Sequence, residues 1–283
     1  RMVDKWVKNQ RVNFKHTSNE DPQRNLRIGF VSGDLYSHPV SSFLKPFWAN
    51  IDRERNKLYI YHTSPKYDGV SEYYKNSAAC WRNVSTTSQL ELARIIHQDK
   101  IDILIDLSGH TGYNRLLTFA LKPAPLEISW IGYPGTTGLT AMDYRICGTW
   151  MAEPGELDSQ FTEKLIYMPM PVQYEPPSNA PAINPLPALN SDVFTFGSLN
   201  RPKKINDSVI AQWAQILINA PKSRMIIGYM PSEEVSESLR QRLESHGVKP
   251  HQLLFRLKTN FNEYMMMHHE IDILLDTFPY NGG

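Results

Sequence analysis

The sequence predicts an α/β protein made of two units, each with a mostly parallel sheet covered by helices. Strand-like and helix-like segments alternate along both halves of the chain, as they do where parallel strands are connected by helices. Between the halves, residues 169–190 contain seven prolines, a density that regular structure does not tolerate. We therefore expect a linker or the end of an upstream region at 1–25, domains at 26–168 and 191–283, and a proline-rich linker at 169–190.

The first half begins with a polar stretch that has no clear periodicity, so residues 1–25 are expected to be irregular. Apolar runs then alternate with segments whose apolar side chains recur at helical spacing, as in residues 88–98. The expected strands are 26–31, 57–62, 101–107 and 126–131, and the expected helices are 41–51, 88–98 and 115–121.

The second half repeats this alternation after the prolines. Its final run, 271–278, is expected to be a strand that ends just before a glycine pair. The other expected strands are 193–196, 225–228 and 253–256, and the expected helices are 207–217, 233–246 and 261–269.

Composition excludes several classes of protein. The net charge of +1 argues against nucleic acid or an anionic membrane as a partner. No apolar run reaches the roughly 20 residues of a membrane helix, and Cys80 and Cys147 are expected to be reduced thiols in a cytoplasmic protein. The sequence has neither a Walker A motif nor a G-x-G-x-x-G fingerprint, and no cluster with metal-ligand spacing, so we expect no cofactor and no metal.

Two histidines are candidates for chemistry in the first half. His38 follows the first strand directly and opens a helix, where a side chain with a pKa near neutrality can accept a proton from a hydroxyl. A capping or surface histidine is the alternative. His97 lies near the end of a helix, where a lone histidine is most often a cap that the helix dipole favours.

Two loops at strand ends are rich in glycine. Residues 106–112 combine two glycines with polar side chains, although a plain tight turn explains them as well. Residues 130–138 combine three glycines with a proline, two hydroxyls and Tyr133, a composition that can present donors to a sugar. A simple turn is again the alternative.

The second half offers a candidate diphosphate site. Arg201, Lys203 and Lys204 precede a helix that Asn206 or Asp207 caps, and cations beside a helix N-terminus favour phosphate. A solvated basic loop is the alternative. A helix beginning just after the glycine pair at 282–283 would complete a phosphate cradle.

These segments, in this order, resemble the catalytic region of the O-GlcNAc transferase family, which has the two-domain GT-B fold. The similar stretches are 26–43, 95–107, 121–143, 163–169, 196–217 and 272–283. The motifs that carry the resemblance are His38-Pro39, Lys122-Pro123-Ala124-Pro125, Gly132-Tyr133-Pro134-Gly135-Thr136, Lys204-Ile205 and Asp276-Thr277-Phe278-Pro279-Tyr280-Asn281-Gly282-Gly283.

The resemblance implies transfer of GlcNAc from UDP-GlcNAc to Ser or Thr hydroxyls of proteins, with inversion and without a metal. It implies a catalytic role for His38, as base or acceptor-positioning group, and a second active-site histidine at His97. It places Ile131, Gly132 and Pro134 in the loop that lines the sugar.

In the second half, the resemblance implies that Lys204 steadies the β-phosphate as UDP leaves. Asn200 and Arg201 match polar contacts to the diphosphate, and Tyr264 matches a ring that packs against uracil. Residues 281–283, which are Asn281, Gly282 and Gly283, lead into the pyrophosphate-binding helix.

Three departures from the family pattern matter. Animal members carry a lysine where Phe261 stands, and a long insert where this chain has only the proline-rich linker, so the resemblance is to bacterial-type members. The family's hydroxyl-rich helix start and ribose-binding acid fall beyond Gly283. We therefore expect residues 1–283 alone to bind UDP weakly and to show no turnover.

The sequence alone also allows two other functions. A related N-glycosyltransferase uses UDP-glucose and an Asn acceptor, and no residue separates the two activities. A non-catalytic binding fragment is a third possibility. Family members usually carry tetratricopeptide repeats upstream, to which residues 1–25 would be the join.

Overall fold

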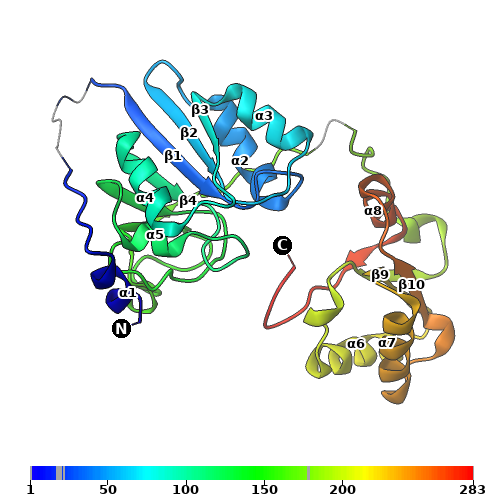
Figure 1. The fold of residues 1–283 in the computed structure, drawn as a ribbon. Coiled ribbons are helices and arrows are strands. Elements are labelled where there is room, and N and C mark those ends of the chain that lie inside the picture. Colours follow the sequence, from blue (N-terminus) through cyan, green and yellow to red (C-terminus); the bar gives the residue numbers. More distant parts are fainter. Residues whose placement is uncertain (1, 17–20, 22, 177–178, 283) are drawn as a thin grey trace. The chain divides into compact units, whose positions relative to one another are not determined.

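The structure, a computed structural model, describes residues 2–16, 21, 23–176 and 179–282. The chain forms two units, unit 1 (Arg1–Glu175) and unit 2 (Pro176–Gly283), each described here by itself (Figure 1). They divide inside the proline-rich stretch 169–190, where the described residues form one short 3-10 helix, η2 (Pro187–Asn190).

Unit 1 is built on a seven-stranded sheet with the order β3-β2-β1-β4-β5-β6-β7, in which all neighbours pair in parallel. The chain moves outward from β1 in one direction and from β4 in the other. The carboxyl ends of β1 and β4 are therefore a topological switch point, where α/β sheets bind ligands. The strands are β1 (Leu26–Ser32), β2 (Asn56–His62), β3 (Cys80–Asn83), β4 (Ile103–Asp106), β5 (Leu126–Ser129), β6 (Tyr144–Gly148) and β7 (Lys164–Met168).

Helices cover both faces of this sheet, because its strands carry apolar side chains on both sides. Phe30 packs with Trp48 in one core, and the next residue, Val31, packs with Leu92 and Phe119 in another. The helices of unit 1 are α1 (Met2–Gln10), α2 (Pro39–Asn50), α3 (Gly69–Ser77), α4 (Gln89–Gln98), α5 (Leu116–Ala120) and the 3-10 turn η1 (Asp158–Gln160).

Unit 2 has a smaller parallel sheet with the order β10-β9-β8-β11, so its own switch point lies at the carboxyl ends of β8 and β11. Trp213 and Leu239 pack over Ile227 in its core. Its strands are β8 (Phe194–Ser198), β9 (Ser223–Met230), β10 (Leu253–Leu257) and β11 (Ile273–Leu274). Its helices are α6 (Asp207–Asn219), α7 (Glu233–Ser245), α8 (Phe261–Met267) and the 3-10 turns η3 (Pro202–Lys204), η4 (Pro250–Gln252) and η5 (His268–Glu270), besides η2.

Two expectations from the sequence were wrong in the fold. Residues 1–25 are not wholly irregular, because α1 forms and Val3 packs against the core beside α4 and α5. The expected strand 271–278 pairs only at Ile273 and Leu274. Beyond Leu275 the chain is held by side-chain hydrogen bonds to Asp276 instead of a ladder.

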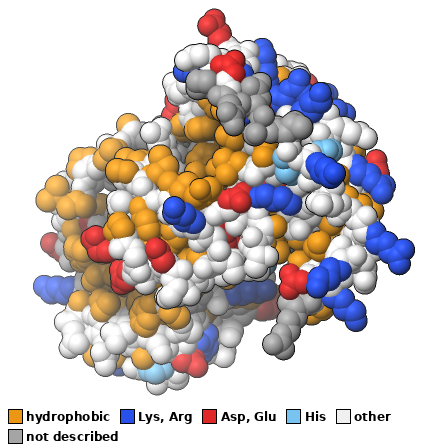
Figure 2. All heavy atoms as spheres, turned by 90° about the vertical axis from the view of Figure 1, so that its left-hand side faces the viewer, with side chains coloured by type: hydrophobic (Ala, Val, Ile, Leu, Met, Phe, Trp, Pro, Cys, Tyr) orange, Lys and Arg blue, Asp and Glu red, His pale blue; other side chains and the backbone are white. Residues whose placement is uncertain are grey.

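The surface carries charges of both signs (Figure 2), and the described helices are too short or too polar to span a membrane. In the face that Figure 2 draws, lysine and arginine side chains are scattered among acidic and uncharged ones, in keeping with the net charge of +1. Among the described helices, none is both long enough and apolar enough to cross a lipid bilayer.

Candidate active site

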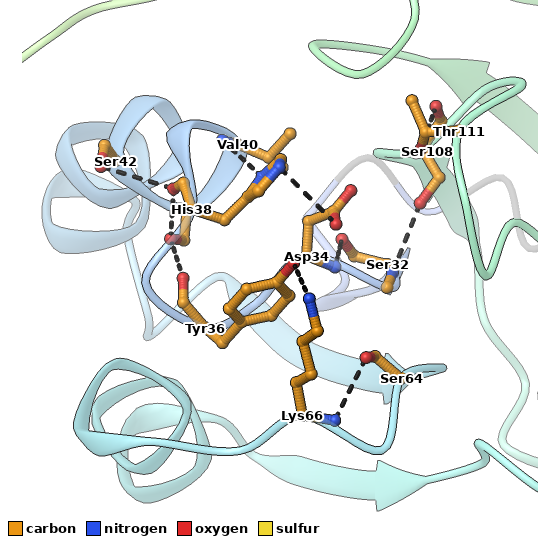
Figure 3. A network of polar contacts seen from close by, with 12 residues as sticks. Ser32, Asp34, Tyr36, His38, Val40, Ser42, Ser64, Lys66, Ser108 and Thr111 are labelled. Atoms are coloured by element: carbon orange, nitrogen blue, oxygen red, sulfur yellow. Dashed lines mark hydrogen bonds and ion pairs between the residues drawn. The ribbon is translucent and has the colours of Figure 1, made fainter. Parts of the chain in front are cut away.

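His38 lies at the carboxyl end of β1 and caps α2. Its backbone is extended (φ −152°), and its Nδ1 accepts a hydrogen bond from the Val40 amide at 3.3 Å (Figure 3). The Nε2 atom lies 3.9 Å from Oδ1 of Asp34. The capping and functional interpretations of His38 are therefore compatible, because the cap uses Nδ1 and leaves Nε2 directed toward Asp34.

Asp34 is a residue that the sequence analysis did not single out. It is 7% exposed, and its Oδ2 accepts no hydrogen bond from the described residues. Burial raises the pKa of its carboxyl above the ordinary value, while His38 and Lys66 act in the opposite direction. Lys66 itself donates to the Tyr36 hydroxyl at 3.3 Å (Figure 3). The sequence signal that could have identified Asp34 is an acidic residue just after a buried strand.

The two glycine-rich loops of unit 1 are bonded to each other beside this switch point. Ser108 accepts from the Gly33 amide through its Oγ (3.3 Å) and from the Tyr133 amide through its carbonyl (3.1 Å). His110 Nε2 is 3.0 Å from the carbonyl oxygen of Thr136. The loops 106–112 and 131–138 therefore form one connected arrangement next to the residues that follow β1.

The predicted sugar-lining residues lie in this arrangement. Ile131 has φ +62°, a left-handed conformation that is strained for a β-branched residue. A Cβ atom on Gly132 would lie 2.6 Å from the Leu107 carbonyl oxygen, so only glycine fits there. Pro134 occupies the exposed turn that follows. The structure thus brings Ile131, Gly132 and Pro134 together with the 106–112 loop.

Asp106 anchors that loop from the end of β4. It is fully buried, and its carboxylate accepts from the amides of Ser108 (3.1 Å) and Gly109 (2.8 Å). Burial raises its pKa to about 6 even though these amides and Arg145 favour the charged form. A folded-state pKa above the unfolded value of 3.8 means that the folded protein holds this proton more tightly.

We predict from this shift that Asp106 makes unit 1 less stable as the pH rises. Its contribution is fully present below about pH 4 and is lost as the pH passes about 6, a change of about 3 kcal/mol. The measurement is the free energy of unfolding of wild type and Asp106→Asn between about pH 4 and pH 7. The wild-type value relative to the variant should fall with rising pH, and a rise would contradict the prediction.

His97 does not join this cluster, and the structure does not bring it together with His38. It lies in the last turn of α4, which leads into the amino end of β4, because the helix returns antiparallel to the strands. Its ring packs 4.9 Å from Phe14 and 5.7 Å from His16. His38 lies at the opposite, carboxyl edge of the sheet.

Unit 2 gathers its predicted phosphate residues around Asp276, at the ends of β8 and β11. The Asp276 carboxylate accepts from Asn200 (3.0 Å), from Asn281 (3.3 Å) and from the Gly282 amide (2.7 Å). Burial alone would raise the pKa of Asp276, but these bonds and the Thr277 amide hold it below the ordinary value. Like Asp34, Asp276 was not among the predicted site residues.

Lys204 lies in the same cluster. Its Nζ donates to the Asn281 carbonyl oxygen and lies 4.8 Å from the centre of the Tyr280 ring. Asn206 caps α6 through the Val209 amide and donates to the Phe278 carbonyl at 2.7 Å. The cation therefore stands beside the amino end of α6, an arrangement that favours an anionic ligand.

Two predicted residues of unit 2, Arg201 and Tyr264, lie outside that set of bonds. Arg201 is exposed and precedes η3. Tyr264 in α8 packs 5.9 Å from the ring of Tyr229, near the carboxyl end of β9. Gly283 lies outside the described residues. Among the described side chains, no three of His, Cys, Asp or Glu are grouped so that they could hold a metal ion.

Comparison with known proteins first defines the class. An O-GlcNAc transferase mutant from Thermobaculum terrenum matches with a TM-score of 0.88 at 31% identity, over 99% of this chain and 54% of that one. A glycosyltransferase from Rickettsia africae matches in fold alone, with a TM-score of 0.51 at 10% identity, over 88% of this chain and 72% of that one. The fold is therefore that of the GT-B glycosyltransferases.

The particular family follows from the sequence match. The chain belongs to glycosyl transferase family 41, whose model matches residues 2–173. A probable UDP-N-acetylglucosamine–peptide N-acetylglucosaminyltransferase SPINDLY of Petunia hybrida is 37% identical over 94% of this chain. A second probable UDP-N-acetylglucosamine–peptide N-acetylglucosaminyltransferase, SEC of Arabidopsis thaliana, is 30% identical over 92% of this chain. The chain spans 29% of the length of the first relative and 27% of the second.

Proposed function

We propose that this chain is part of a protein O-GlcNAc transferase, which moves GlcNAc from UDP-GlcNAc to Ser or Thr hydroxyls with inversion and without a metal. The observation that carries the proposal is that each unit places candidate catalytic side chains at its topological switch point. Unit 1 has His38 and Asp34 in the segment that follows β1, and unit 2 has Lys204 beside a helix start. The names of the family relatives indicate the donor and the peptide acceptor.

In this proposal the acceptor hydroxyl is held and deprotonated by unit 1. The Nδ1 atom of His38 accepts from an amide, so its proton resides on Nε2, which suits donation to the acceptor oxygen. Asp34 then takes the hydroxyl proton through Oδ1, which lies 3.9 Å from Nε2 of His38, and the raised pKa of its carboxyl suits that role. This favours the positioning role of His38 over that of general base.

Unit 2 takes the leaving group. As the acceptor oxygen bonds to C1 of the sugar, the bond from C1 to the β-phosphate oxygen breaks and UDP departs with an added negative charge. Lys204 and the amino end of α6 stabilise that charge. We further propose that the whole protein acts in the cytoplasm and carries upstream tetratricopeptide repeats.

The test of the function is the mass that the full-length protein adds to an acceptor peptide. Transfer of HexNAc adds about 203 Da, and transfer of hexose adds about 162 Da. Which sugar is transferred depends on the contacts that the donor makes in its binding pocket. We expect an addition of about 203 Da, and we expect it to disappear when the modified Ser or Thr of the peptide is replaced by Ala. An addition of about 162 Da on Asn would instead identify an N-glycosyltransferase. No addition with any nucleotide sugar would indicate a binding role.

Metal independence gives a separate prediction. Transfer by the full-length protein should survive EDTA, because Lys204 and backbone donors are proposed to take up the charge of the diphosphate. The measurement is the transfer rate with and without the chelator. A rate that disappears in EDTA and returns with Mg²⁺ or Mn²⁺ would show that this charge argument is wrong.

A further inference from the structure

Glu163 holds the return leg of the 131–138 loop, although it lies in a different segment, immediately before β7. The residue is 3% exposed. It accepts from the Thr137 amide (2.6 Å), from the Thr137 hydroxyl and from the Thr136 hydroxyl (2.7 Å). Both carboxylate oxygens are therefore used by two consecutive loop residues.

The other leg of the same loop is held at the 106–112 loop. The Tyr133 amide bonds to the Ser108 carbonyl, and Gly132 packs against the Ser108 backbone too closely for any Cβ. Only the turn at Pro134 and Gly135 lies between these two attachments. The conformation of the turn is thus set from one side by Ser108 and from the other by Glu163.

Burying a charged carboxylate costs free energy unless other groups bond to it or pair with it. The groups around Glu163 therefore decide whether its carboxylate stays charged. Burial alone would raise the pKa of Glu163, but the bonds from Thr137 and Thr136 hold it below the ordinary value. Arg145 in β6, which is 4% exposed and donates to Ser129 at 2.9 Å, is a nearby cation that acts on both Glu163 and Asp106. One buried cation therefore supports the carboxylates that hold both loops.

We propose that Glu163 is a positioning residue for the donor sugar, acting by fixing the loop that carries Gly132 and Pro134. This inference rests on the proposed function, in which that loop lines the sugar. A charged acceptor holds three donors at once, whereas a neutral amide would turn one of its atoms into a donor facing another donor. Loss of the charge should therefore release the loop and weaken its fit to the sugar.

The experiment compares Glu163→Gln with wild type in the full-length protein. Hydrogen bonds to charged groups are strong enough that we expect the KM and Kd for UDP-GlcNAc to rise about tenfold or more. The KM for the acceptor peptide should stay unchanged, and the Thr137 amide should exchange with solvent faster. Glu163→Asp, which keeps the charge, should recover part of the donor affinity. Glu54→Gln, the same change at an exposed position, is the control and should change none of these values.

A purely structural role gives a different result. Faster exchange of the loop amides with an unchanged donor Kd would overturn the proposal, as would unchanged exchange. If Glu163→Gln does not fold, Thr137→Val removes one donor at constant shape, and donor Kd must then rise for the inference to stand. If wild type binds UDP-GlcNAc but transfers nothing, the proposed function fails while the same Kd comparison still decides the role of Glu163.

Discussion

Replacement of Lys204 by alanine is expected to lower kcat of the full-length protein by about 100-fold or more. The side chain is the cation of the unit 2 cluster, where its ammonium bonds to the Asn281 carbonyl beside the amino end of α6. A diphosphate that leaves in the transition state gains charge there, and without the lysine that charge is stabilised by backbone donors alone. The measurement is kcat at saturating UDP-GlcNAc and peptide.

The matched control is Lys203→Ala. Lys203 precedes Lys204 in η3 but is exposed, whereas Lys204 is half-buried against Tyr280. The control variant removes the same charge from the same loop, so general electrostatics changes equally in both proteins. We expect Lys203→Ala to retain most of its kcat. An unchanged kcat in Lys204→Ala, or equal losses in both variants, would refute the assignment of Lys204 to the leaving group.

The periodicity of the sequence predicted the architecture because a parallel sheet covered on both faces needs long apolar runs separated by amphipathic helices. It located β1, α4 and α6 to within a few residues. It missed α3 and β3, which lie between 62 and 88, and β6 and β7, which are short and partly exposed. The three strands are stabilised by neighbours in the sheet more than by their own pattern, whereas α3 has a local signal in the capping box of Asp68 and Ser71.

The candidate site shows a similar division between what is local and what is not. The position of His38 follows from its place after β1, and the cluster of Asn200, Lys204 and Asn281 follows from the motifs that contain them. His97 lies away from His38 because α4 returns to the amino edge of the sheet, and a motif in the sequence does not reveal that edge. Asp276 was missed as a site residue because its partners come from two segments that meet only in the fold.

The two switch points explain why loops that directly follow strands form the clusters of both unit 1 and unit 2. In each unit the chain leaves a central strand, β1 or β8, and its neighbours are added first on one side and later on the other. The later strand, β4 or β11, brings a second loop to the same edge as the first. Gly33 then meets Ser108 in unit 1, and Asn200 meets Asp276 in unit 2. Each cluster therefore joins segments 75 or 76 residues apart.

Gly132→Ala is expected to reduce kcat/KM of the full-length protein by about 100-fold, the size of effect that follows from misplacing a binding group by about 1 Å. The added Cβ would lie 2.6 Å from the Leu107 carbonyl oxygen and 2.6 Å from the Ser108 carbonyl carbon. Both contacts are with backbone, so no side-chain rotation can relieve them, and the loop must move away from Ser108. The bond from the Tyr133 amide to Ser108 should break, and its amide should exchange faster.

The comparison variant is Gly112→Ala in the neighbouring loop. A Cβ there meets no atom within 4 Å, so the same methyl group is added without displacing the backbone. Far-ultraviolet circular dichroism and the unfolding midpoint should stay close to wild type for Gly112→Ala. For Gly132→Ala the secondary structure should persist while the midpoint falls and kcat/KM drops, because the strain is local to one loop. Full activity with normal Tyr133 exchange in Gly132→Ala would mean that the close packing of this loop does not set the shape of the sugar-facing turn.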